Sequence, residues 1–268
     1  MDISNLHLSL ISAAGMMLVA IAAVVFWRRL THVSYRWFWI GAGLWTVAVA
    51  IKFAIAIPTN GPIFKYLEST LTYPAYLVVG GLFGGLESSL TEIGLTWLAV
   101  LIWRQLGSNA DRAIGIGIGA GAFEAFLLGL LGALAVAGAM TGVEETKLIR
   151  DQIDAVAQTS PLFWLIGTAE RVIAVLCHAS TRALVLLGVV HRRPWMVFWG
   201  FAIFTILDGI ATTAHLTGKL GTFSMWWIEL ALLPAALVSI PILYWCYAQW
   251  GASQTADVQA NSQVIPAE

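Results

Sequence analysis

The chain has 268 residues, of which 59% are hydrophobic and only 11% are charged. Because soluble domains carry about 25% charged residues, this composition excludes a large soluble enzyme and indicates a polytopic membrane protein. The formal net charge of −1 gives no argument for a nucleic-acid partner. The first partner that the composition predicts is therefore the lipid bilayer.

Seven segments are apolar enough to cross a bilayer, which takes about 20 residues in an α-helix. In chain order they are 6–27, 36–57, 72–103, 112–140, 161–190, 194–216 and 223–249. The stretch from Pro58 to Pro62 is predicted to end the second segment, and Pro161 and Pro194 open the fifth and sixth, where proline suits the first helical turn. The expected fold class is all-α, a polytopic membrane helix bundle with about seven transmembrane helices.

Arginines concentrate in the loops that follow the first, third and fifth segments. The positive-inside rule places these loops in the cytoplasm, which puts the N-terminus outside and the C-terminus inside. We expect one transmembrane domain over residues 1–250 and a disordered cytoplasmic tail over 251–268, because the tail is polar. The predicted location is a prokaryotic plasma membrane.

Residues 141–159 are too polar to span the bilayer. Thr141 and Glu144 have the spacing of a capping box, and Ile149 and Ile153 recur at helical spacing. The pattern predicts a short amphipathic helix on the outer surface. An ordinary surface helix is the common outcome for such a segment, and a lid over a site is the sharper alternative.

Four ionisable residues in four consecutive predicted helices fall at nearly one depth: Glu92, Glu124, His178 and Asp208. Counted from the nearest cytoplasmic markers, all four lie roughly 18–22 Å into the membrane. A charged side chain at that depth costs several kcal/mol, so such residues are usually functional or paired. We expect the four side chains to converge on one polar site.

The fifth predicted helix carries a polar stripe. Arg171, His178 and Arg182 are spaced i, i+7 and i+11, which places them on one helical face, with Glu170 slightly to the side. Because this face cannot favourably meet lipid, it should point into the bundle, toward the carboxylates.

Two further charges lie in other predicted helices and are candidate partners. Lys52 is predicted to pair with a carboxylate, and Glu229 with Arg171. Spacing alone leaves three uses of the polar layer open: a metal site, a proton or ion pathway, and structural ion pairing. Structural pairing is the commonest fate of buried charges.

Glycines alternate just before Glu124, at Gly115, Gly117, Gly119 and Gly121. Small residues four apart let membrane helices approach closely, so the pattern predicts tight packing. The alternative is that the thin helix wall lets another backbone or a substrate reach Glu124.

Four motifs carry a resemblance to a known family: Thr91-Glu92-Ile93-Gly94, the glycine-rich run that ends in Glu124-Ala125, Glu170-Arg171 followed by His178, and Asp208-Gly209. Over about residues 36–250 the chain resembles the YhfC-type membrane peptidases, relatives of the CAAX-protease and bacteriocin-processing group. The resemblance implies a peptidase that cleaves within the membrane with the help of a divalent metal such as zinc. The implied catalytic residues are Glu92 and Glu124, and the implied metal ligands are His178 and Asp208. The supporting residues expected around them are Glu170, Arg171, Arg182 and Glu229.

The chain departs from the family pattern at several motif positions. Ala120 and Phe204 stand where the pattern has histidines, and Thr91 and Leu95 replace a glutamate and an arginine. Whether the chain is an enzyme therefore stays open. A non-catalytic scaffold or binding subunit of a membrane complex is one alternative, and a proton-coupled transporter is another. The predicted partners besides lipid are a membrane-protein or peptide substrate, or a partner subunit.

Overall fold

The computed structural model describes residues 3–252, and helices make up nearly all of this stretch. The prediction of an all-α membrane bundle is confirmed there, since seven helical segments are long and apolar enough to cross a membrane. The elements are α1 (Ile3–Thr31), α2 (Tyr35–Thr70), α3 (Tyr73–Ser88), η1 (Ser89–Ile93), α4 (Gly94–Ile102), η2 (Arg104–Gly107), α5 (Ala110–Met140), η3 (Glu144–Thr146), α6 (Lys147–Thr159), η4 (Phe163–Leu165), α7 (Ile166–Val190), α8 (Pro194–Leu216) and α9 (Trp226–Trp250). The predicted tail lies, from residue 253 on, outside the described residues, and the orientation in the membrane stays a prediction.

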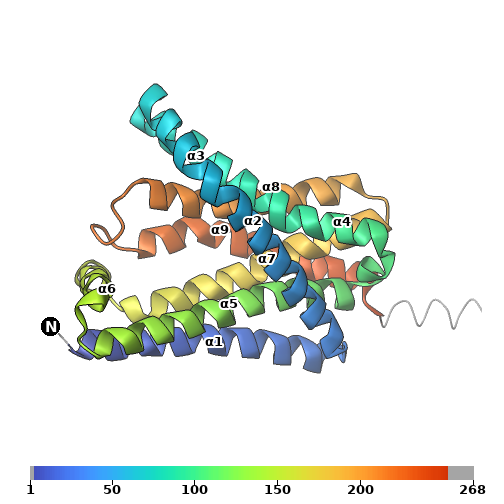
Figure 1. Cartoon of the computed structure of the whole chain (residues 1–268). Helices are drawn as coiled ribbons and strands as arrows, with labels where there is room; N and C mark the ends of the chain where they lie inside the picture. Colours follow the sequence, from blue (N-terminus) through green and yellow to red (C-terminus); the bar gives the residue numbers. More distant parts are fainter. Residues whose placement is uncertain (1–2, 253–268) are drawn as a thin grey trace, which may run out of the picture.

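Helix α7 is the centre of the bundle and is buried along most of its length. It packs against α5 on one side and against α8 and α9 on another, while α1 packs on α5 (Figure 1). Helix α2 crosses the other helices at a steep angle, packing against α5 (Figure 1). The polar stripe of α7 therefore faces protein rather than lipid.

The alternating glycines of α5 bring three helices close together. A Cβ atom at Gly119 would lie 2.1 Å from the carbonyl oxygen of Phe38 in α2. On the opposite side, a Cβ atom at Gly121 would lie 2.9 Å from Cα of Val175 and 3.0 Å from Cβ of His178, both in α7. The predicted close packing is confirmed, and it sets α5 directly against the helix that carries the histidine.

The predicted end of the second helix at Pro58 is wrong, because α2 continues through Pro58 and Pro62 to Thr70. Each proline removes only one backbone donor, so the remaining hydrogen bonds can continue the helix past it. Between the two prolines, the Thr59 hydroxyl donates a hydrogen bond of 2.7 Å to the carbonyl of Ile55. Proline therefore does not end this helix.

The third predicted span contains a π-helical turn, η1, between α3 and α4. Hydroxyl groups support its backbone: Thr91 Oγ1 donates to the carbonyl of Glu87 at 2.8 Å, and Thr96 Oγ1 to that of Glu92 at 3.0 Å. Such turns are rare and often lie at functional sites. This one carries Glu92.

The segment predicted as an amphipathic helix contains α6, but the predicted capping box is wrong. Thr141 is the C-cap of α5, and Gly142, with φ of +78°, ends that helix. A left-handed residue in this position is a common helix stop. Helix α6 therefore begins only at Lys147, and its Ile149 and Ile153 pack against a small apolar cluster of α1 and α5.

Candidate functional site

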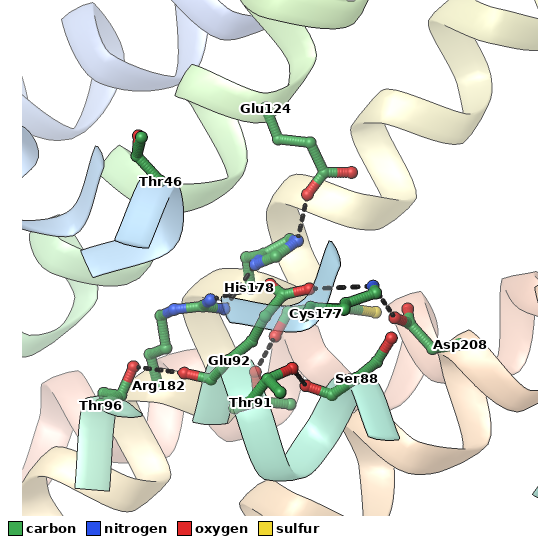
Figure 2. Close-up of polar contacts among 12 residues, drawn as sticks. Thr46, Ser88, Thr91, Glu92, Thr96, Glu124, Cys177, His178, Arg182 and Asp208 are labelled. Carbon is green, nitrogen blue, oxygen red and sulfur yellow. Dashed lines mark hydrogen bonds and ion pairs between the residues drawn. The ribbon is translucent and has the colours of Figure 1, made fainter. Parts of the chain in front are cut away.

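Three of the four residues of the predicted polar layer converge. One potential ligand atom from each of Glu92, Glu124 and His178 lies within 4.8 Å of the other two. They come from η1, α5 and α7, three elements far apart in the sequence (Figure 2). Asp208 of α8 lies outside this group and is connected to it through Lys52.

His178 is held between an anion and a cation. Its Nε2 lies 2.8 Å from Glu124 Oε2, and its Nδ1 contacts the guanidinium of Arg182, one helical turn away (Figure 2). A guanidinium has only N–H donors, so Nδ1 is the acceptor in this contact. The neutral imidazole then carries its proton on Nε2 and donates it to Glu124.

Glu92 is almost fully buried and has two cationic partners. Its Oε2 lies 3.2 Å from Arg182, and its Oε1 lies 3.5 Å from Lys52 Nζ. The same ammonium lies 3.7 Å from Asp208 Oδ2, so Lys52 bridges two carboxylates from different helices. The prediction that Lys52 pairs with a carboxylate is confirmed.

Arg171 organises the other end of the cluster. Its guanidinium donates to Glu124 Oε1 at 2.5 Å and also contacts Glu170. Glu229, predicted as its partner, makes no ion pair with Arg171 within 4.0 Å, although it lies near enough to interact electrostatically with Arg171 and Glu170. The prediction of a direct pair is wrong because Glu124 and Glu170 already occupy the guanidinium. Glu229 Oε2 is buried without a hydrogen-bond partner among the described residues.

Except for Arg182 and Glu229, these groups line one cavity of about 310 Å³. Its wall is polar where the ionisable residues meet and otherwise apolar, with side chains that include Trp45 of α2, Leu128 and Leu131 of α5, and Leu232 of α9. A mostly apolar pocket with a few convergent polar groups is the usual form of a binding or active site. The predicted convergence is thus borne out for the cavity as a whole, Asp208 included.

The fixed charges around the cavity do not balance. Four carboxylates line it (Glu92, Glu124, Glu170 and Asp208), and three permanent cations pair with them (Lys52, Arg171 and Arg182). If all four are ionised and His178 is neutral, one negative charge lacks a counter-charge. Buried charges are expensive when they are unpaired, so the site favours a further cation.

The two residues that replace expected histidines occupy different environments. The buried Phe204 ring lies edge-on to His178, with 5.2 Å between the ring centroids, and it lines the cavity. Ala120 is also buried but does not line the cavity. Phe204 therefore fills space beside the imidazole without offering a ligand atom.

Sequence patterns miss the π-helical turn and the bridging geometry of Lys52. The signal for Lys52 is available, because a lysine in the middle of an apolar segment needs a partner. The turn has no comparable signal, since the hydrophobic pattern of one π turn hardly differs from that of an α-helix.

Comparison with known proteins gives one match. The model of the YhfC intramembrane metalloprotease family matches residues 15–232, a stretch that includes every residue of the cluster. No curated protein and no solved structure matches the chain.

Proposed function

The chain belongs to the YhfC intramembrane metalloprotease family, and we propose that it hydrolyses peptide bonds of membrane-embedded substrates at the cavity around Glu92, Glu124 and His178. The observation that carries this proposal is the convergence of these three side chains, with potential ligand atoms all within 4.8 Å of one another. A peptidase of this family implies a metal ion, and the donor set can be tested for its fit.

The donor set fits a divalent cation in kind and in number. Zinc accepts imidazole nitrogen and carboxylate oxygen, and three protein ligands leave a fourth position open for water or substrate. The negative charge that the ion pairs leave uncompensated also favours a bound cation. Glu92, Glu124 and His178 would hold the ion, which when bound would polarise the scissile carbonyl and acidify a water molecule.

The surrounding residues have separate roles in this proposal. Arg171 fixes the Glu124 carboxylate and Arg182 fixes that of Glu92, so both ligands are oriented in advance. Asp208 lines the same cavity but stands outside the donor group. We assign it the role of proton acceptor from the attacking water, because a general base must remain free of the ion.

The decisive experiment measures metal content and peptide cleavage on the same preparation. The purified chain, in detergent and after incubation with zinc, is offered a set of transmembrane peptides of about 20 apolar residues. We expect one bound ion per chain and cleavage within the apolar stretch. Both should be lost in Glu124→Gln and His178→Ala and retained in Glu144→Gln, which changes an exposed loop glutamate. A wild-type chain that binds no ion and cleaves no peptide would refute the proposal.

One observation favours a second candidate, a family member that binds membrane peptides without cleaving them. Because Arg182 donates to Nδ1, His178 carries its proton on Nε2, the nitrogen that faces Glu124. Ligation through Nε2 requires that proton to move to Nδ1 and Arg182 to move away. A chain that captures transmembrane peptides but leaves them intact at saturating zinc would support this candidate.

A further inference from the structure

Lys52 holds an unusual place in the cluster, since it is the cation closest to Asp208 and shares Glu92 with Arg182. Its Nζ lies 3.5 Å from Glu92 Oε1 and 3.7 Å from Asp208 Oδ2. Both distances are longer than those of a tight ion pair, so the ammonium sits between the two carboxylates without a close bond to either.

The position of Lys52 is fixed by the path of α2. This helix crosses the bundle at a steep angle (Figure 1), and its Lys52 lines the same cavity as residues of α7. The Lys52 side chain keeps 26% of its surface exposed, whereas Arg182 is fully buried. Of the two cations beside Glu92, Lys52 is therefore the one whose side chain can move away from the carboxylate without disrupting buried packing.

A third cation at Glu92 would meet a strong electrostatic penalty while Lys52 remains there. Like charges about 4 Å apart repel each other strongly at a partly exposed protein site, and a divalent ion feels twice the repulsion of a monovalent one. Glu92 Oε1 is available as a ligand only if the ammonium moves off it. Lys52 can then remain paired with Asp208.

We propose that Lys52 is a tethered cation that competes with the divalent ion for Glu92 and so lowers the metal affinity of this site. The inference rests on the proposed function, because it assumes that Glu92 is a ligand. Without the ion, Lys52 pairs with both Glu92 and Asp208. When the ion binds, Lys52 gives up Glu92 and remains with Asp208.

The test is the zinc affinity of the purified chain, measured by competition with a chromophoric chelator. Lys52→Met removes the charge but keeps an unbranched apolar stem, and it should raise the affinity about tenfold or more. Lys52→Arg keeps the charge and should bind zinc as weakly as the wild type. Lys65→Met is the matched control, since it removes the same charge from an exposed position of the same helix, and it should change nothing.

A measurement on the wild-type chain covers the case in which Lys52→Met does not fold. Saturating zinc should increase the labelling of Lys52 by an amine-reactive reagent, relative to Lys65, because the ion takes Glu92 away from the ammonium. Equal zinc affinity in the wild type and Lys52→Met, or labelling of Lys52 that zinc leaves unchanged, would overturn the inference and leave the proposed function standing. Absence of zinc binding in every form, Lys52→Met included, would overturn both.

Discussion

Placing a histidine at Phe204 tests most directly whether this position beside His178 can supply a further metal ligand. The Phe204 and His178 rings lie with their centroids 5.2 Å apart and their planes at 76°. Two imidazoles on one tetrahedral zinc ion, each about 2.1 Å from the metal through nitrogen, have ring centres about 5 Å apart. The substitution Phe204→His therefore places a second imidazole at the separation that a shared ion requires.

The expected effect has two parts of opposite sign. Without metal, the variant buries an imidazole where no partner is built for its N–H group, which costs roughly 1–3 kcal/mol of stability. With zinc, the new ligand should raise the affinity at least about tenfold, since even groups that only touch a ligand change affinity by that factor or more. At a zinc concentration 100 times the dissociation constant, binding stabilises the folded state by about 2.7 kcal/mol, which offsets the stability lost by burying the imidazole.

The assay is thermal unfolding of the purified chain with and without zinc, together with the zinc dissociation constant. We expect Phe204→His to melt below the wild type without zinc and to gain more from zinc than the wild type does. Phe201→His is the matched control, because it makes the same change about one turn away on α8, at a residue that does not line the cavity. Equal zinc affinities for Phe204→His and the wild type would refute the idea that Phe204 stands in a ligand position.

Three further substitutions separate the roles of neighbouring groups. Asp208→Asn should still bind the ion at saturating zinc but lose peptide cleavage, because Asp208 lies outside the donor group, and metal analysis beside a cleavage assay checks this. Arg171→Met should cost about 3–5 kcal/mol, since it leaves the Glu124 carboxylate without its buried partner, and a large fall in melting temperature would show it. Gly121→Val should cost about 1–3 kcal/mol by forcing α5 away from α7, whereas Gly43→Val, with nothing within 4 Å of the added Cβ, should melt like the wild type.

Depth along the membrane was predictable from the sequence because helix rise is constant. Counting residues from the arginines that are predicted to be cytoplasmic places Glu92, Glu124, His178 and Asp208 on one level, and all four line the same cavity. Counting does not give the tilt or rotation of each helix. For that reason the sequence could not separate Asp208, which faces Lys52, from the three residues that face one another.

Local backbone exceptions were not predictable by the same route. The prolines of α2 predict a helix end, but each removes a single backbone donor and the helix continues to Thr70. The π-helical turn at Glu92 leaves the hydrophobic pattern almost unchanged, yet it alters which way every following side chain points. Only the turn bears directly on the site, because it carries Glu92, whereas Lys52 precedes both prolines of α2.

The ion pairs and the proposed metal centre share the same carboxylates, and this explains how such a site can persist in a membrane. Arg171, Arg182 and Lys52 neutralise most of the acidic charge, so the helices can pack before any ion arrives. The cost is that each ligand already has a cationic partner, which an arriving ion must displace or share. On the proposed function, Phe204 beside His178 and Lys52 beside Glu92 act in the same direction, since the first offers no ligand atom and the second competes for one.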